Sequence, residues 1–289
     1  MFIYKGARYQ NKGSNTMQFV NKRDLYCDEF KAFILCEYKN EMRLIKKLIN
    51  ISKEAIEIQD THNTWSYEGI CHSFAKTIVD YSKMAYDNLV LGHFDAAHMI
   101  SRAVLENLVC LDIIVSNQDL ELWKYYWVYS HYHDLQKHKM KGRIDLSGLF
   151  DIFDWTVPEE FYRSPGKDKK GKEIKPYIER LYGWTYKINF EQRFSFAGLC
   201  DLLDDRAVYD VFGLLSEYSH GTSFYRKLQS SISVDNMMFM FVNMYWSLYR
   251  MVTIYCSNNV NEDFDNVTDE LEFIFHRYIR YEESLKNNT

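Results

Sequence analysis

The chain has 289 residues, of which 47% are hydrophobic and 26% are charged, and its formal net charge is −5. This balance is typical of a folded globular protein and excludes a disordered or collagen-like chain. The acidic net charge excludes an overall basic field that would attract nucleic acid or anionic membranes to the whole surface.

Helical periodicity dominates the first half of the chain. Apolar residues recur every three or four positions in the segment 23–59, and similar patterns predict three further helices, over 65–91, 94–115 and 118–141. Ser116 followed by Asp119 fits a capping box at the start of the last of these. Residues 1–22 lack the pattern, so we expect an N-terminal arm there.

The segment 143–190 interrupts this pattern. It holds all three prolines of the chain and the basic, turn-rich stretch RSPGKDKKGKEIKP. We expect an irregular insertion here, between long proline-free helices. Lys169 and Lys170 lie in this stretch and are candidate contacts to phosphate, with solvated surface charge as the alternative.

Helical periodicity returns after the insertion, over 195–203, 206–220, 235–256 and 262–286. Asp204 or Asp205 is a natural N-cap for the second of these helices. No segment shows sustained alternation with a period of two, so the predicted fold class is mainly α. We expect a helical bundle in which residues 23–289 form a single domain, with division into two domains as the alternative.

One helical stretch has the length of a membrane span. Residues 237–256 approach the ~20 apolar residues that cross a bilayer, but Asn243, Arg250 and three tyrosines interrupt them. A buried bundle helix is therefore the expectation, with no membrane span. The six cysteines form no CxxC pair and residues 1–21 lack a signal-peptide pattern, so we expect reduced thiols in a cytoplasmic protein.

The most informative polar residues lie on the segment 94–115. Asp95, His98, Arg102 and Glu106 recur at steps of three and four residues and share one helical face. Two interpretations are open. The stripe is the solvated face of an amphipathic helix, or it faces a cleft between helices, where paired ionised groups are candidates for a functional site.

A second polar group lies in FGLLSEYSHGTS, residues 212–223. Ser216 and His220 are four residues apart on a helix that we expect to end at Gly221. A histidine in the last turn faces the negative end of the helix dipole, which favours its protonated form. This suits a proton donor or an anion-binding group, and simple helix capping is the alternative.

Other side chains give weaker indications. His131 and His133 point to different sides of a helix and do not chelate a metal together, so we expect no metal site. The aromatic run from Trp123 to Tyr132 favours core or interface packing, and a homodimer through this region is expected. The chain also lacks GxxxxGK[ST], GxGxxG, HExxH and GxSxG motifs, so we expect no cofactor.

Two of these stretches resemble motifs of a bacterial family of helical proteins of unknown function. Residues 100–115, ISRAVLENLVCLDIIV, resemble its Arg-x-x-x-Glu helix, and residues 208–224, VYDVFGLLSEYSHGTSF, resemble its Tyr…Leu-Ser-x-x-x-His-Gly ending. The resemblance spans residues 75–255. The motif positions that it implies are Arg102, Glu106, Tyr209, Ser216 and His220.

More distantly, the chain resembles the HEPN group of helical nucleases and nucleotide-binding domains, which are common in toxin–antitoxin and phage-defence systems. HEPN nucleases typically carry Arg-x4-6-His and cleave RNA without metal, by acid–base chemistry at the ribose 2′-hydroxyl. No arginine here precedes a histidine at that spacing. The resemblance therefore implies a pair formed in space, by Arg102 from one helix and His220 from another.

The first functional hypothesis that follows is a metal-independent ribonuclease or nucleotide-acting enzyme of bacterial defence or stress response. His220 is the expected general acid and base, Arg102 stabilises phosphate charge, and Glu106 and Ser216 orient them. His98 and Tyr209 are candidate binding residues. The alternative is a non-catalytic helical module for binding or dimerisation, in which the same motif forms a buried polar network.

Overall fold

The computed structural model describes residues 36–58, 66–138, 157–188, 195–219, 234–256 and 261–287. Within these ranges the regular elements are nine α-helices and three short 3-10 helices, and no strand is present. The mainly α fold class predicted from the sequence is confirmed. The predicted arm, residues 1–22, and the first part of the segment 23–59 lie outside the described residues.

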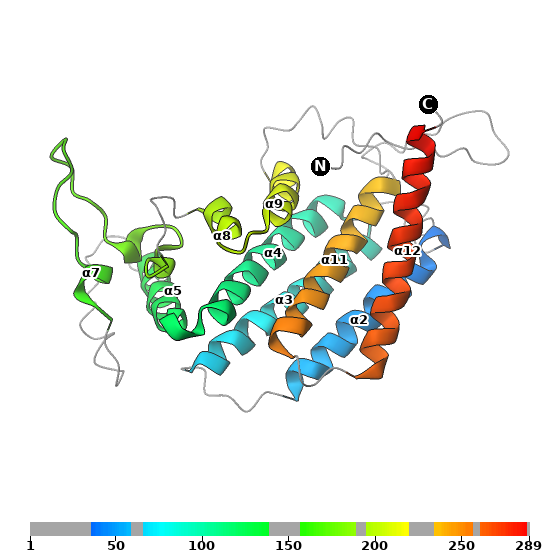
Figure 1. Cartoon of the computed structure of the whole chain (residues 1–289), viewed down its shortest axis with the longest axis horizontal. Coiled ribbons are helices and arrows are strands. Elements are labelled where there is room, and N and C mark those ends of the chain that lie inside the picture. The colour runs from blue at the N-terminus through cyan, green and yellow to red at the C-terminus, as the bar shows by residue number, and fades with distance from the viewer. Residues whose placement is uncertain are drawn as a thin grey trace. The chain divides into compact units, whose positions relative to one another are not determined.

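The long helices lie close to the segments predicted for them (Figure 1). In the first half of the chain they are α2 (Lys39–Glu57), α3 (Tyr67–Val90), α4 (Phe94–Ser116) and α5 (Leu122–His138). After the insertion come α8 (Phe196–Leu202), α9 (Arg206–Ser219), α11 (Val234–Tyr255) and α12 (Glu262–Asn287). Proline is absent from all eight, so each keeps its backbone hydrogen bonds without a break of that kind.

The chain divides into two compact units, and the first comprises Met1–Asp60, Ala75–Leu108 and Asp210–Thr289. In this unit α2 packs along both α11 and α12, and α11 also contacts α12 (Figure 1). The apolar residues of α2 recur at helical spacing, so they fill one face and are buried, as Leu44, Ile45 and Leu48 show. This hydrophobic face accounts for the fold of the first unit better than its exposed ion pairs do.

Helix α11 contains the stretch that has the length of a membrane span. Its apolar residues are buried in the first unit, and Met240, Phe241 and Leu248 are fully inaccessible to solvent. Arg250 is exposed on the same helix, as expected for a helix that packs in a bundle. In the part of the chain that the structure describes, no helix has the length and apolar character needed to cross a membrane.

The second unit comprises Thr61–Phe74 and Val109–Tyr209, and it includes the predicted insertion. The described part of the insertion, 157–188, is ordered by three short helices, α7 (Glu159–Tyr162), η3 (Tyr177–Glu179) and η4 (Gly183–Thr185). Both η3 and η4 pack on α5. The insertion therefore belongs to the core of its unit.

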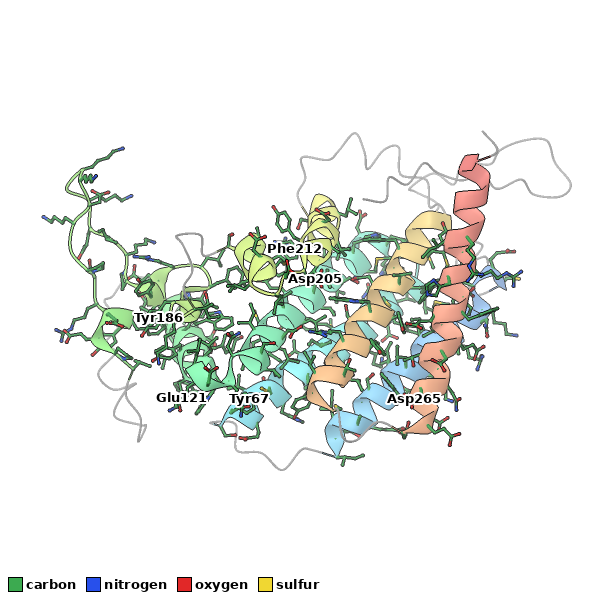
Figure 2. The ribbon with its side chains drawn as sticks, in the orientation of Figure 1. Tyr67, Glu121, Tyr186, Asp205, Phe212 and Asp265 are labelled. Carbon is green, nitrogen blue, oxygen red and sulfur yellow. The ribbon has the colours of Figure 1, made fainter. Side chains whose placement is uncertain are left out.

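Aromatic side chains hold the insertion on α5. The rings of Tyr125, Phe161 and Tyr186 form a cluster, in which the centroid of Tyr125 lies 5.3 Å from that of Phe161 and 5.2 Å from that of Tyr186, and Figure 2 labels Tyr186. Trp184 is fully buried and meets Tyr126 edge-on at 5.3 Å. Edge-to-face pairs of this kind add to the hydrophobic stabilisation from burial. The core interpretation of the aromatic run is thus supported, and the homodimer stays a prediction.

Two local details position these elements. Gly183 lies so close to η3 that an added Cβ would stand 1.8 Å from the Tyr177 carbonyl oxygen, so only glycine fits there. The predicted capping box before α5 is wrong, because the Ser116 hydroxyl donates to the Asp112 carboxylate at 3.1 Å. A 3-10 turn (η2, Gln118–Leu120) follows, and α5 begins only at Leu122.

Candidate functional site

The polar stripe of α4 is largely withdrawn from solvent. His98 is 2% exposed, and Asp95, Arg102 and Glu106 are half-buried. Apolar residues on the other sides of this part of the helix, Leu105 among them, are buried as well. His98 therefore does not lie on a solvated face, whereas the three ionised residues keep part of their surface accessible, and both interpretations of the stripe stay open. Because a buried histidine and three partly buried ionisable residues share this face, the stripe is the candidate site.

His98 is the most buried member of the stripe. Its Nδ1–H donates to the Phe94 carbonyl oxygen at 2.8 Å, which fixes the Nδ1-protonated tautomer. Its ring is nearly parallel to that of Phe239 on α11, with the centroids 6.5 Å apart. Burial lowers the pKa of His98, so the ring is neutral near pH 7. A neutral imidazole suits hydrogen bonding and packing rather than an ionic contact to phosphate.

Arg102 connects α4 to α9. Its guanidinium carbon lies 4.6 Å from the centroid of the Phe212 ring, within the ~6 Å range of a cation–π interaction. Phe212, labelled in Figure 2, comes from α9 and is 9% exposed. This contact brings the Arg-x-x-x-Glu stretch against the helix that carries the second predicted motif. Both residues belong to the first unit.

Three motif residues lie on or directly after α9. The Ser216 hydroxyl donates to the Phe212 carbonyl oxygen at 2.6 Å, and Ser216 is half-buried. Tyr209 lies one turn before Phe212 and is 45% exposed. His220 follows Ser219, the last residue of α9, and lies outside the described residues. The N-terminus of this helix is fixed as predicted, since Val208 N–H donates to Asp205 Oδ1 at 3.3 Å.

The remaining candidates lie in the second unit. Lys169 and Lys170 are exposed at the tip of a short hairpin in the insertion. His131 is exposed and its ring contacts that of Trp127 at a centroid distance of 3.7 Å. His133 contacts Tyr129 in the same manner. Among the side chains that the structure places, no group of three or more histidine, cysteine, aspartate or glutamate residues is arranged to hold a metal ion.

Phe212 is the residue that sequence reasoning missed. An apolar residue on an amphipathic helix is read as core, and nothing in its own neighbourhood assigns it an arginine partner. The sequence does hold one indication: Phe212, Ser216 and His220 are spaced four residues apart, which is the spacing of residues along one ridge of a helix. An aromatic residue that precedes two candidate polar residues at this spacing is therefore also a candidate for the site.

The candidate residues of α4 and α9 fall in a segment matched by a known family. The model of DUF5677, described as a family of unknown function, matches residues 68–237. The chain belongs to DUF5677. The membership predicted from the two motifs is confirmed at the level of an uncharacterised family, with bounds that differ from the expected 75–255. No curated protein and no solved structure shows significant similarity to this DUF5677 chain.

Proposed function

We propose that this DUF5677 protein is a HEPN-like protein of bacterial defence or stress response that acts on RNA or a nucleotide without a metal ion. The observation that supports the proposal is the contact between Arg102 and Phe212. It brings the arginine of one motif to the helix that leads, in the sequence, to the histidine of the other. A HEPN-type pair built from two helices requires such a connection.

The geometry of Arg102 suits a group that binds phosphate. The guanidinium carbon lies 4.6 Å from the centroid of the Phe212 ring, and the N–H donors of a guanidinium point outward in its plane. One arginine can therefore rest on Phe212 and donate hydrogen bonds to phosphate oxygens at the same time. Half-burial of Arg102 lowers the local dielectric and strengthens its attraction for an anion.

Ser216 has the hydrogen-bonding state expected of a residue that orients a histidine. Its hydroxyl hydrogen is directed to the Phe212 carbonyl oxygen, and a hydroxyl oxygen can accept hydrogen bonds as well as donate one. His220 lies four residues later in the sequence, at the spacing of neighbours along a helical ridge. The proposed role of Ser216 is therefore to orient His220.

The proposed reaction on RNA is an internal transfer. The ribose 2′-oxygen attacks the adjacent phosphorus while the bond from phosphorus to the 5′-oxygen breaks. A base accepts the 2′-hydroxyl proton and an acid returns a proton to the leaving 5′-oxygen, so that the products are a 2′,3′-cyclic phosphate and a 5′-hydroxyl. His220 supplies proton transfer, and Arg102 stabilises the added negative charge on the phosphoryl oxygens.

Inducible expression in a bacterial host tests this proposal. We expect the wild-type protein to arrest growth and degrade total RNA, and Arg102→Ala and His220→Ala to abolish both effects. The matched controls are Arg277→Ala and His276→Ala, which remove exposed residues of the same types from α12. Intact RNA in arrested cells, or equal loss of toxicity in the controls, would contradict the proposal.

A second function is supported by the burial of the stripe itself. A neutral, 2% exposed His98 and a half-buried Arg102 and Glu106 also fit a non-catalytic binding module, in which these residues form a structural polar network. In that case Glu106→Ala is expected to lower the melting temperature by several degrees. Glu262→Ala, at an exposed position of α12, is the control. An unchanged melting temperature of Glu106→Ala would exclude the network.

A further inference from the structure

The basic stretch of the insertion forms a defined hairpin, residues 164–175, which we call the basic hairpin. At its tip the Asp168 carbonyl oxygen accepts from Gly171 N–H at 2.9 Å, and Asp168 N–H donates to the Lys172 carbonyl oxygen at 2.8 Å. Gly171 has a φ of 77°. A turn followed by a glycine in the left-handed region is a common three-residue hairpin connection. The stretch is thus built as a hairpin, in contrast to the irregular loop predicted from its composition.

Side chains fix this hairpin at both ends. Asp168 Oδ1 accepts from the backbone N–H groups of Lys170 and Lys172, at 2.8 and 2.9 Å. The Ser164 hydroxyl donates to the Ile174 carbonyl oxygen at 2.7 Å, which closes the base. The Asp168 carboxylate therefore stabilises the turn, and these hydrogen bonds fix the backbone conformation of the tip.

The lysines of the basic hairpin are exposed, and in the described part of the chain none of their ammonium groups forms an ion pair or a hydrogen bond. Figure 2 shows their side chains extending outward from both sides of the hairpin, with the nitrogen atoms at the ends. By contrast, Lys76 and Lys83 on α3 pair with Asp80 and Asp87. The hairpin lysines are Lys167, Lys169, Lys170, Lys172 and Lys175.

We propose that the basic hairpin binds the phosphate backbone of a nucleic acid. Five lysines against two carboxylates concentrate positive charge on one projecting element of a chain whose formal net charge is −5. Contacts from ammonium groups to phosphates carry no sequence information, so we expect this binding to be independent of sequence. The inference deepens the proposed function and rests on it for the choice of RNA as the natural ligand.

The composition of the tip favours a polynucleotide over a membrane surface. Residues 166–173, GKDKKGKE, include no apolar side chain that could enter the lipid boundary. Five lysines within twelve residues, 164–175, can instead each contact a phosphate of a polynucleotide. Acidic lipid is therefore an alternative ligand that the experiment must reject.

The test measures binding of a fluorescent 2′-deoxy oligonucleotide of about 20 nucleotides to the full-length protein, by anisotropy over a range of salt concentrations. The variant K169Q/K170Q removes two charges from the tip. If each lysine neutralises one phosphate, its loss lowers the slope of log K against log salt by about 0.7, so the double variant binds about 25-fold more weakly at about 0.1 M salt. The control K76Q/K83Q removes the same charge from α3.

The inference is supported if only the hairpin variant loses affinity and slope. It is overturned if both double variants bind like the wild type, if both lose affinity equally, or if vesicles of phosphatidylserine compete better than the oligonucleotide does. The 2′-deoxy ligand lacks the attacking hydroxyl of the proposed reaction. Binding by the hairpin and cleavage at Arg102 therefore succeed or fail separately.

Discussion

The contact between Arg102 and Phe212 makes a quantitative prediction about stability. The distance of 4.6 Å is well inside the ~6 Å range of a cation–π interaction. Such contacts contribute about 0.5–1 kcal/mol at exposed sites and about 2 kcal/mol when desolvated. Phe212 is 9% exposed and Arg102 is half-buried, so we expect a coupling energy of about 1 kcal/mol between them.

A double-mutant cycle measures this coupling. Arg102→Met and Phe212→Leu keep most of the apolar volume while they remove the cation and the ring, and urea unfolding followed by circular dichroism gives the free energy of unfolding of each variant. Arg102→Met combined with Phe273→Leu is the control, because Phe273 is 69% exposed on α12. A coupling below about 0.3 kcal/mol for Arg102 and Phe212 would refute the placement of α4 against α9.

Other predictions concern single positions. Because burial lowers the pKa of His98, the free energy of unfolding should fall as the pH drops below the unfolded value of about 6.5, and His98→Gln should weaken that dependence in urea titrations. Gly183→Ala should lower the free energy of unfolding by about 2–4 kcal/mol, because the added Cβ would collide with the backbone of Tyr177. Gly213→Ala should raise it by about 0.5–1 kcal/mol, because the added Cβ has open space on α9. Burial raises the pKa of the Cys71 thiol to about 12, so mass spectrometry should find iodoacetamide on exposed Cys36 long before Cys71.

The long helices could be predicted from the sequence because their determinants are local. Apolar spacing within α2 marks its buried face, and the absence of proline permits the length of α3 and α4. The order within the insertion could not be predicted, because it depends on contacts between distant residues. Trp184 is buried against Tyr126, which lies far earlier in the chain, and no local sequence pattern predicts this contact.

The candidate site was predictable in part. Helical spacing correctly grouped His98 and Arg102 on one face, but the burial of that face depends on neighbouring helices that the spacing does not reveal. The capping prediction was wrong because the Ser116 hydroxyl donates to the Asp112 carboxylate of its own helix instead of capping the next helix. Phe212 escaped notice because an aromatic partner for a cation has no sequence pattern of its own.

Cleavage of a labelled RNA by the purified full-length protein in EDTA tests the central claim most directly. We predict products with 2′,3′-cyclic phosphate and 5′-hydroxyl ends, and a loss of rate of about 100-fold or more in both Arg102→Ala and His220→Ala, while His276→Ala retains full activity. Intact RNA with the wild-type protein, a requirement for added Mg²⁺, or an unchanged rate in Arg102→Ala would contradict the account.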